Sequence, residues 1–339
     1  MRARLTLAAA LSLAPALVGC AGRVLLTDMT PPPASAAREL ETTPYFPQVT
    51  HQCGPAALAT VLGASGVETT PDALVPAVYV PGLHGSLQVE LLAASRRSGR
   101  IPYPVEPALD ALIAEVDAGR PVLVLQNLGF TLVPRWHYAV VVGYSLDDDR
   151  LVLRSGRTRR EVVTAERFER SWSRAGGWGI VLLAPGEMPA RPAADAYFAA
   201  AAAFEGASPG PAALPAWERA LERWPQSNDI VFAFGNALLS DGEGRSAERC
   251  YNALLARSPG HVGARNNLAM LLAERGCVTA ARSTLAPALA TAGQDAAWLA
   301  VLQQSSAEIE AMSANEARCE HDTPTPAEAE RELHGVSCD

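Results

Sequence analysis

The sequence predicts an α+β domain followed by an all-α repeat domain. In the first half of the chain, an apolar helical segment precedes three apolar runs that have the length of β-strands. From residue 194 the composition shifts to alanine, leucine and arginine, with helical spacing of the apolar residues. Helices followed by a run of strands are typical of α+β folds, and 339 residues suffice for two ordinary domains.

Charge and composition exclude several classes of function. The net charge is −8, and from Ala307 onward nine carboxylates face two arginines. A nucleic-acid-binding protein needs a basic face to neutralise phosphates, so we expect no nucleic-acid partner. All 28 basic residues are arginine, which excludes a Schiff-base lysine and a lysine-bearing phosphate loop. Nothing in the sequence implies a cofactor.

Residues 1–20 have the features of an export signal. The apolar stretch 5–18 follows two arginines and is too short to span a bilayer. The four residues that end in Cys20 resemble the lipobox of bacterial lipoproteins, which implies acylation of Cys20 and a lipid anchor in the membrane. Ala21 resembles the sorting pattern of Gram-negative outer-membrane lipoproteins, so we expect the protein in the cell envelope, at the periplasmic face of that membrane. The alternative is an ordinary signal peptide cleaved nearby.

Two segments are expected to lie outside the domains. Residues 21–43 contain three consecutive prolines and are predicted to form a linker. Residues 313–339 are acidic and poor in apolar residues, so we expect this tail to be disordered.

The cysteines divide into three groups. An exported chain enters an oxidising space where disulfides persist. With Cys20 assigned to lipidation, four cysteines of the C-terminal half can pair in three ways, between which the sequence does not decide. They are Cys250, Cys277, Cys319 and Cys338. Cys53 remains alone in the first domain, as either a reactive thiol or a buried inert one.

Cys53 lies at the start of a predicted helix. Pro55 fits the first helical turn, where its missing N–H costs nothing, and residues 56–62 continue as an apolar helix. The dipole and the free N–H groups at a helix N-terminus favour a thiolate. A structural cysteine would more naturally lie mid-helix on an apolar face, so the position favours a reactive thiol.

Three further helices and three strands complete the first domain. We expect helices from residue 71, over 87–98 with Ser86 as its cap, and over 109–118. The strand-like runs are 121–126, 137–144 and 150–155, and three aspartates between the last two indicate a hairpin with His137 at its open start. A cysteine at a helix start and a histidine on a sheet can form the activated nucleophile of a thiol hydrolase.

The segments around these two residues resemble papain-like cysteine peptidases of the bacteriocin-processing type, which cut after double-glycine leaders. The resemblance covers residues 44–188 and rests on Gln48, on Gln52-Cys53-Gly54-Pro55-Ala56-Ala57, on the strand at Pro121 and on Trp136-His137-Tyr138-Ala139-Val140-Val141-Val142-Gly143-Tyr144. It implies a papain-like fold with helices first and an antiparallel sheet after them. The family has many exported relatives whose substrates are unknown. Because we find no transporter segment beside this domain, we do not expect the double-glycine specificity to transfer.

The resemblance implies roles for individual residues. Cys53 matches the nucleophile, His137 the base, and Gln48 the amide that forms the oxyanion hole with the backbone N–H of Cys53. The family usually places Asp-Pro or Asn-Pro after the histidine hairpin, but this chain has Ser155-Gly156 there. Ser155 can orient the ring but cannot stabilise an imidazolium as a carboxylate does. The site is therefore a dyad assisted by Ser155, or catalysis is weak.

The second predicted domain, residues 194–305, repeats with a period of 34 residues. Trp217 recurs as Tyr251, and Gly242 recurs as Gly276. This pattern resembles tetratricopeptide repeats, in which small residues let paired helices approach. The clear repeats are 229–258 and 262–290. Such an array presents a groove for a peptide or a protein partner, and the alternative is that it serves only as a scaffold.

Together the patterns predict an exported, lipid-anchored cysteine peptidase with a repeat module. One alternative is a catalytically weak or inactive peptide-binding adaptor that keeps the peptidase fold, and another is hydrolysis of amide bonds in cell-wall peptides. A carboxylate or amide within hydrogen-bond reach of His137 favours the enzyme, and its absence favours the adaptor. We expect no zinc site from His51, Cys53 and His137, because no two of them have the spacing of a ligand pair on one helical turn.

Overall fold

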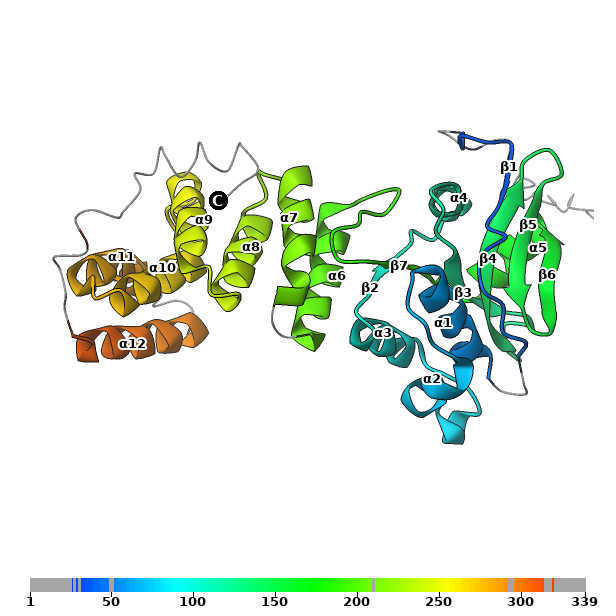
Figure 1. The fold of residues 1–339 in the computed structure, drawn as a ribbon, viewed down its shortest axis with the longest axis horizontal. Helices are drawn as coiled ribbons and strands as arrows, with labels where there is room; N and C mark the ends of the chain where they lie inside the picture. Colours follow the sequence, from blue (N-terminus) through cyan, green and yellow to red (C-terminus); the bar gives the residue numbers. More distant parts are fainter. Residues whose placement is uncertain are drawn as a thin grey trace, which may run out of the picture.

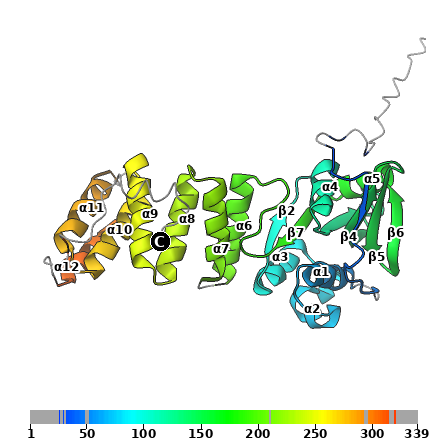
Figure 2. The ribbon, with the colours of Figure 1, turned by 45° about the horizontal axis from the view of Figure 1, so that its top comes forward.

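The structure, a computed structural model, describes residues 26, 29, 32–48, 52–208, 211–291, 296–313 and 319. The molecule is elongated, with a sheet domain at one end and a row of helices at the other (Figure 1). Figure 2 shows this row running from α6 to α12. Within the described segments no helix has the length and apolar character needed to cross a bilayer. The predicted signal peptide with Cys20, residue His51 and most of the acidic tail with Cys338 lie outside the described residues.

The N-terminal domain has the predicted α+β composition. Its helices are α1 (Cys53–Ala64), α2 (Pro71–Val78), η2 (Pro81–Leu83), α3 (Gln88–Arg97), α4 (Leu109–Asp117) and α5 (Ala165–Ser173). Its strands are β1 (Ala37–Glu39), β2 (Ile101–Pro104), β3 (Val122–Asn127), β4 (Trp136–Ser145), β5 (Arg150–Ser155), β6 (Thr158–Thr164) and β7 (Gly179–Leu183). The strands form one antiparallel sheet in the order β2-β7-β3-β4-β5-β6, with β1 on β4.

Alternate residues of β4 face two different cores. Tyr138, Val140 and Val142 pack in the core that contains the apolar side of α1. Ala139 and Val141 point to the opposite face, into the core that α4 and α5 cover. Because side chains alternate along a strand, His137 belongs to the α5 face although α1 lies on the other side.

The prediction of a linker over residues 21–43 is wrong for part of this span. Residues 37–39 form β1, in which Glu39 pairs with Gly143 beyond the point where β3 ends on β4. Leu26 is fully buried and its backbone N–H donates to the Asp149 carboxylate at 2.9 Å. The free edge of β4 accepts this short strand, since an unpaired strand edge needs hydrogen-bond partners.

The prediction that Ser86 caps the helix over residues 87–98 is also wrong. Helix α3 begins at Gln88 with Leu87 as the preceding residue, and no side chain caps it. The Ser86 hydroxyl is instead buried beside the first turn of α1, where it has no hydrogen-bond partner among the described residues. A Cβ placed on Gly54 would lie 2.3 Å from this hydroxyl oxygen, so the loop packs on α1 only because residue 54 is glycine.

The C-terminal half is a row of antiparallel helix pairs. Its elements are α6 (Ala194–Ala207), η3 (Pro211–Ala213), α7 (Leu214–Arg223), α8 (Asn228–Ser240), α9 (Gly244–Arg257), α10 (Val262–Glu274), α11 (Val278–Thr291) and α12 (Ala296–Ala311). The equivalent turns of the two predicted repeats adopt the same left-handed conformation, with φ of 85° at Gly242 and 86° at Gly276. Tyr197 of α6 contacts Tyr103 of β2, which joins the helices to the sheet domain.

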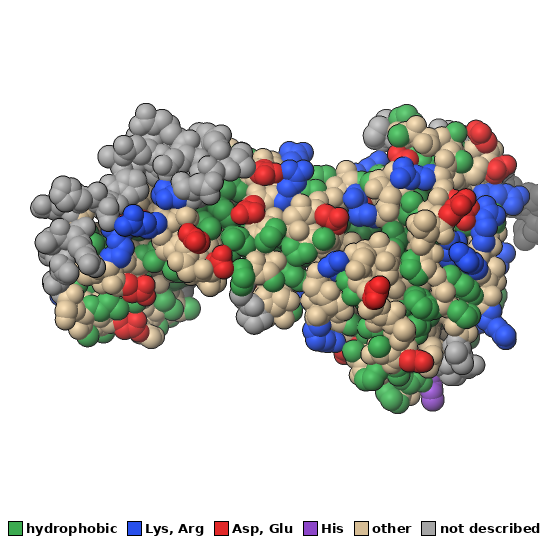
Figure 3. Space-filling model, in the orientation of Figure 1, with side chains coloured by type: hydrophobic (Ala, Val, Ile, Leu, Met, Phe, Trp, Pro, Cys, Tyr) green, Lys and Arg blue, Asp and Glu red, His purple; other side chains and the backbone are tan. Residues whose placement is uncertain are grey.

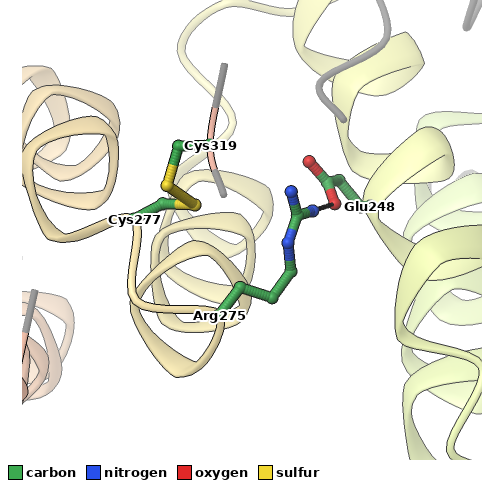
Figure 4. Close-up of a disulfide and its surroundings, with 4 residues drawn as sticks. All are labelled: Glu248, Arg275, Cys277 and Cys319. Carbon is green, nitrogen blue, oxygen red and sulfur yellow. Dashed lines mark hydrogen bonds and ion pairs between the residues drawn. A yellow bond between two sulfur atoms is a disulfide. The ribbon is translucent and has the colours of Figure 1, made fainter. Parts of the chain in front are cut away.

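A disulfide closes the end of the helical row. The structure contains a bond between Cys277 and Cys319, which belongs to one of the three possible pairing schemes. Cys250 is buried in α9. Beside the bond, the Arg275 guanidinium forms an ion pair with the buried carboxylate of Glu248 (Figure 4). The disulfide therefore ties the segment after α12 to the turn between α10 and α11.

Candidate active site

Cys53 is the first residue of α1. Its side chain is half-buried, is not in a disulfide and packs against the core that contains Tyr138 of β4. Burial raises the pKa of the Tyr138 phenol strongly, and the nearby Cys53 thiol adds to the increase. The thiol therefore lies near the side chain of Tyr138, the residue that follows His137 in β4.

His137 is the second residue of β4 and is held by the adjacent strand. Its Nε2 lies 3.0 Å from the Ser155 hydroxyl at the end of β5. Burial lowers the pKa of His137 below its usual 6.5, Arg135 lowers it further, and Glu161 opposes both. The lowered pKa favours the neutral ring, which is the form that accepts a proton from a thiol.

Gln48 connects the segment before α1 to the same end of the sheet. Its backbone N–H donates to the Gly156 carbonyl at 3.0 Å, and its side-chain Nε2 donates to the Tyr138 carbonyl at 3.4 Å. An amide nitrogen carries two hydrogens, so the group that contacts Tyr138 has a second N–H. The predicted oxyanion hole requires one such donor, and this role of Gln48 stays a prediction.

The four predicted residues thus come from separate segments that meet around one end of β4. Cys53 and Gln48 both lie against Tyr138, and Ser155 contacts His137 directly. None of the hydrogen bonds among the described residues joins the Cys53 thiol to the His137 ring. The catalytic pairing of these two groups stays a prediction.

Glu161 is a charged neighbour of His137 that the sequence did not reveal. It lies on β6 opposite Leu153, and with His137 and Ser155 it lines a pocket on the α5 face of the sheet. Its carboxylate favours the charged form of the His137 ring without a hydrogen bond to it. Strand β6 is rich in charged residues, so no apolar run marked it as part of the sheet.

The surroundings of His137 bear on the choice between enzyme and adaptor. Across the part of the chain that the structure describes, the Ser155 hydroxyl is the side-chain group that hydrogen-bonds to the ring, and no carboxylate or amide does so. No group of three or more potential metal ligands occurs among the same residues.

Comparisons with known proteins agree with this architecture. Residues 40–180 match the Peptidase_C39 like family, and residues 238–305 match the tetratricopeptide repeat family. The sheet domain is a C39-peptidase-like domain. The helical row after it contains tetratricopeptide repeats.

Two solved structures resemble the C39-like domain. One is a protein from Bacillus anthracis described as a C39-like peptidase, with 17% identity over 43% of this chain and 97% of that chain, at a TM-score of 0.37. The other is the peptidase domain of Streptococcus ComA, a bifunctional ABC transporter of a quorum-sensing pathway, with 22% identity over 42% of this chain and 98% of that chain, at a TM-score of 0.35. No curated protein matches the chain.

Proposed function

We propose that the C39-like domain hydrolyses peptide bonds, with Cys53 as nucleophile and His137 as general base. The observation that carries the proposal is that Cys53, the first residue of α1, packs against the core that contains Tyr138, while His137, the preceding residue of β4, is held by a hydrogen bond to Ser155. Thiol hydrolases need this combination, because the neutral imidazole must take the thiol proton before attack.

The residues support a balanced acyl-transfer sequence. The ring nitrogen that does not face Ser155 takes the proton of Cys53, and the sulfur attacks the carbonyl carbon. The Gln48 amide and the backbone N–H of Cys53 stabilise the oxyanion. When the C–N bond breaks, the His137 imidazolium returns the proton to the leaving amine. Water then hydrolyses the thioester with His137 again as base, which restores the thiol.

Ser155 acts as a positioning residue in this proposal. Its hydroxyl, 3.0 Å from Nε2, fixes the orientation of the ring. A hydroxyl does not stabilise the imidazolium as a carboxylate does, so the transition state, in which His137 is charged, receives less electrostatic stabilisation. We expect turnover to be slow compared with that of an enzyme whose histidine contacts a carboxylate.

A peptide-binding adaptor is the second candidate function. It is favoured by one observation: within the described residues, no carboxylate or amide hydrogen-bonds to His137. In this case the C39-like domain holds an extended peptide without cleaving it, and the repeats recruit a partner protein.

Incubation with a defined mixture of peptides separates the two candidates. Mass spectrometry should detect products with the wild-type protein and none with Cys53→Ala. Equal unfolding midpoints of the two proteins would show that the substitution leaves the fold intact. Peptides that bind to both proteins and remain uncleaved would contradict hydrolysis and support the adaptor.

We further propose that Cys20 carries the lipid and that the repeats bind a peptide or protein partner at the envelope membrane. The support is the lipobox-like sequence that ends at Cys20. Expression with a clickable fatty acid should label the wild-type protein and leave Cys20→Ala unlabelled. Labelling of both proteins would contradict acylation at this cysteine.

A further inference from the structure

A pocket of about 640 Å³ lies beside His137 on the face of the sheet that α5 covers. His137 and Ser155 line it, whereas Cys53 does not and packs in the core on the other face. Gln126, which pairs with His137 across the strands, also lines the pocket and hydrogen-bonds to Ser171 of α5 at 2.7 Å. The pocket therefore extends from the imidazole away from the thiol.

The pocket is strongly cationic. Five arginines from three parts of the fold line it, against the single carboxylate of Glu161: Arg135 before β4, Arg157 between β5 and β6, and Arg167, Arg170 and Arg174 on or just after α5. The chain as a whole has a net charge of −8, so this positive charge is a local feature. Blue side chains also gather at the end of the molecule that holds β5 and β6 (Figure 3).

Most of this charge has no carboxylate partner. Among the ion pairs of the described residues, only the exposed contact of Arg170 with Glu166 at 3.7 Å involves these five arginines. Arg174 donates to the backbone carbonyl of Asn127 at 2.9 Å, which leaves its charge uncompensated. Guanidinium groups without partners around a concave site attract and bind carboxylates.

The order of steps in the proposed reaction indicates which part of the substrate occupies the pocket. After attack, the acyl part remains on Cys53, while the leaving amine must reach His137 to take its proton. The residues that follow the cleaved bond therefore pass the imidazole and enter the space beyond it. The volume falls in the range of pockets that enclose small ligands, so a few residues fit.

We infer that this pocket recognises carboxylates in the segment of the substrate that follows the cleaved bond. This inference rests on the proposed hydrolysis and names a substrate class for it: peptides with Asp or Glu shortly after the scissile bond, or with a free C-terminus at that distance. A substrate without carboxylates there lacks a partner for the arginines.

Binding to the inactive Cys53→Ala protein tests the inference without turnover. The probe is a fluorescent peptide with two glutamates in its C-terminal half and an amidated end, beside two matched peptides: one with glutamines, and one with glutamines and a free C-terminus. In low salt we expect the glutamate peptide to bind about 3–10-fold more tightly than the amidated glutamine peptide, because each exposed ion pair contributes modestly. About 0.5 M salt should reduce the difference. The third peptide shows whether a terminal carboxylate suffices.

Matched arginine variants locate the site. Combining Arg157→Gln and Arg167→Gln in the Cys53→Ala protein should abolish its preference for the glutamate peptide over the glutamine peptide. Arg159→Gln removes one positive charge from β6, two residues after Arg157, but Arg159 does not line the pocket, so this variant should leave the preference unchanged. Equal binding of all three peptides, or equal loss of preference in both variants, would overturn the inference.

Cleavage by the wild-type protein separates the inference from the proposed function. Arginine-dependent binding of acidic peptides without any cleavage would retain the pocket and refute the hydrolase. Cleavage with no preference for acidic residues after the scissile bond would retain the hydrolase and overturn the pocket assignment.

Discussion

Replacing Ser155 by aspartate places a carboxylate where the structure has a hydroxyl, 3.0 Å from Nε2 of His137. Ser155 is 7% exposed and borders the pocket, so the larger side chain has room and little water screens its charge. An opposite charge at such a distance raises the pKa of a histidine by about 1–3 units. This shift corresponds to about 1.4–4 kcal/mol of stabilisation of the imidazolium.

The assay is an NMR titration of the His137 ring in the Cys53→Ala background, so that the thiol does not contribute. In the starting protein we expect titration below 6.5, since burial lowers the pKa. In Ser155→Asp it should move upward by at least one unit. Ser155→Asn is the control, because asparagine has the same size and hydrogen-bonding reach without the charge.

Equal midpoints for Ser155→Asp and Ser155→Asn would refute the reasoning, because the side chain at residue 155 would then not face the ring. In the protein with Cys53 intact, Ser155→Asp should also raise kcat if imidazolium formation limits turnover. The same pair of variants thus reports both the geometry and its chemical consequence.

Three further predictions use other parts of the structure. Glu161 raises the pKa of His137 and Arg135 lowers it. Glu161→Gln should therefore move the acid limb of the pH–rate profile to lower pH, and Arg135→Gln should move it to higher pH. Shifts of the same sign would contradict this electrostatic account. Gln48→Ala should lower kcat about 10²–10³-fold with little change in KM, measured by steady-state kinetics, because an oxyanion donor acts in the transition state; an unchanged kcat would exclude that role. Cys277→Ser opens a disulfide that spans 42 residues and should cost the repeat helices about 4 kcal/mol in urea unfolding; a cost near zero would show that the unfolded chain is not constrained by it.

The sequence predicted several elements with continuous apolar residues, but it did not identify the short apolar strand β7. Helix α1 and strands β3 to β5 were recognised because their apolar runs are long and bounded by turn residues. Strand β6 is charged and β2 contains two prolines, so neither showed a strand pattern. Strand β1 has three residues and depends on the free edge of β4, a tertiary feature that no local pattern encodes.

The candidate site was predictable where motif and register determine it. The hairpin of β4 and β5 brings Ser155 to His137, as the position of Ser155 after the hairpin suggested. Glu161 and the arginines of the pocket come from segments that only the folded sheet and α5 bring together. The pairing of Cys277 with Cys319 likewise depends on the path of the chain after α12, which composition does not specify.

The rate at which Cys53 is acylated by a peptide thioester, followed by mass spectrometry in the wild type and in His137→Ala, tests the central claim most directly. The account predicts modification at Cys53 that slows at least 100-fold without the imidazole, since general-base assistance contributes about 10²–10⁴-fold. The wild-type rate should fall only below pH 6.5, where His137 becomes protonated. Equal rates in the two proteins would show that the histidine does not activate the thiol.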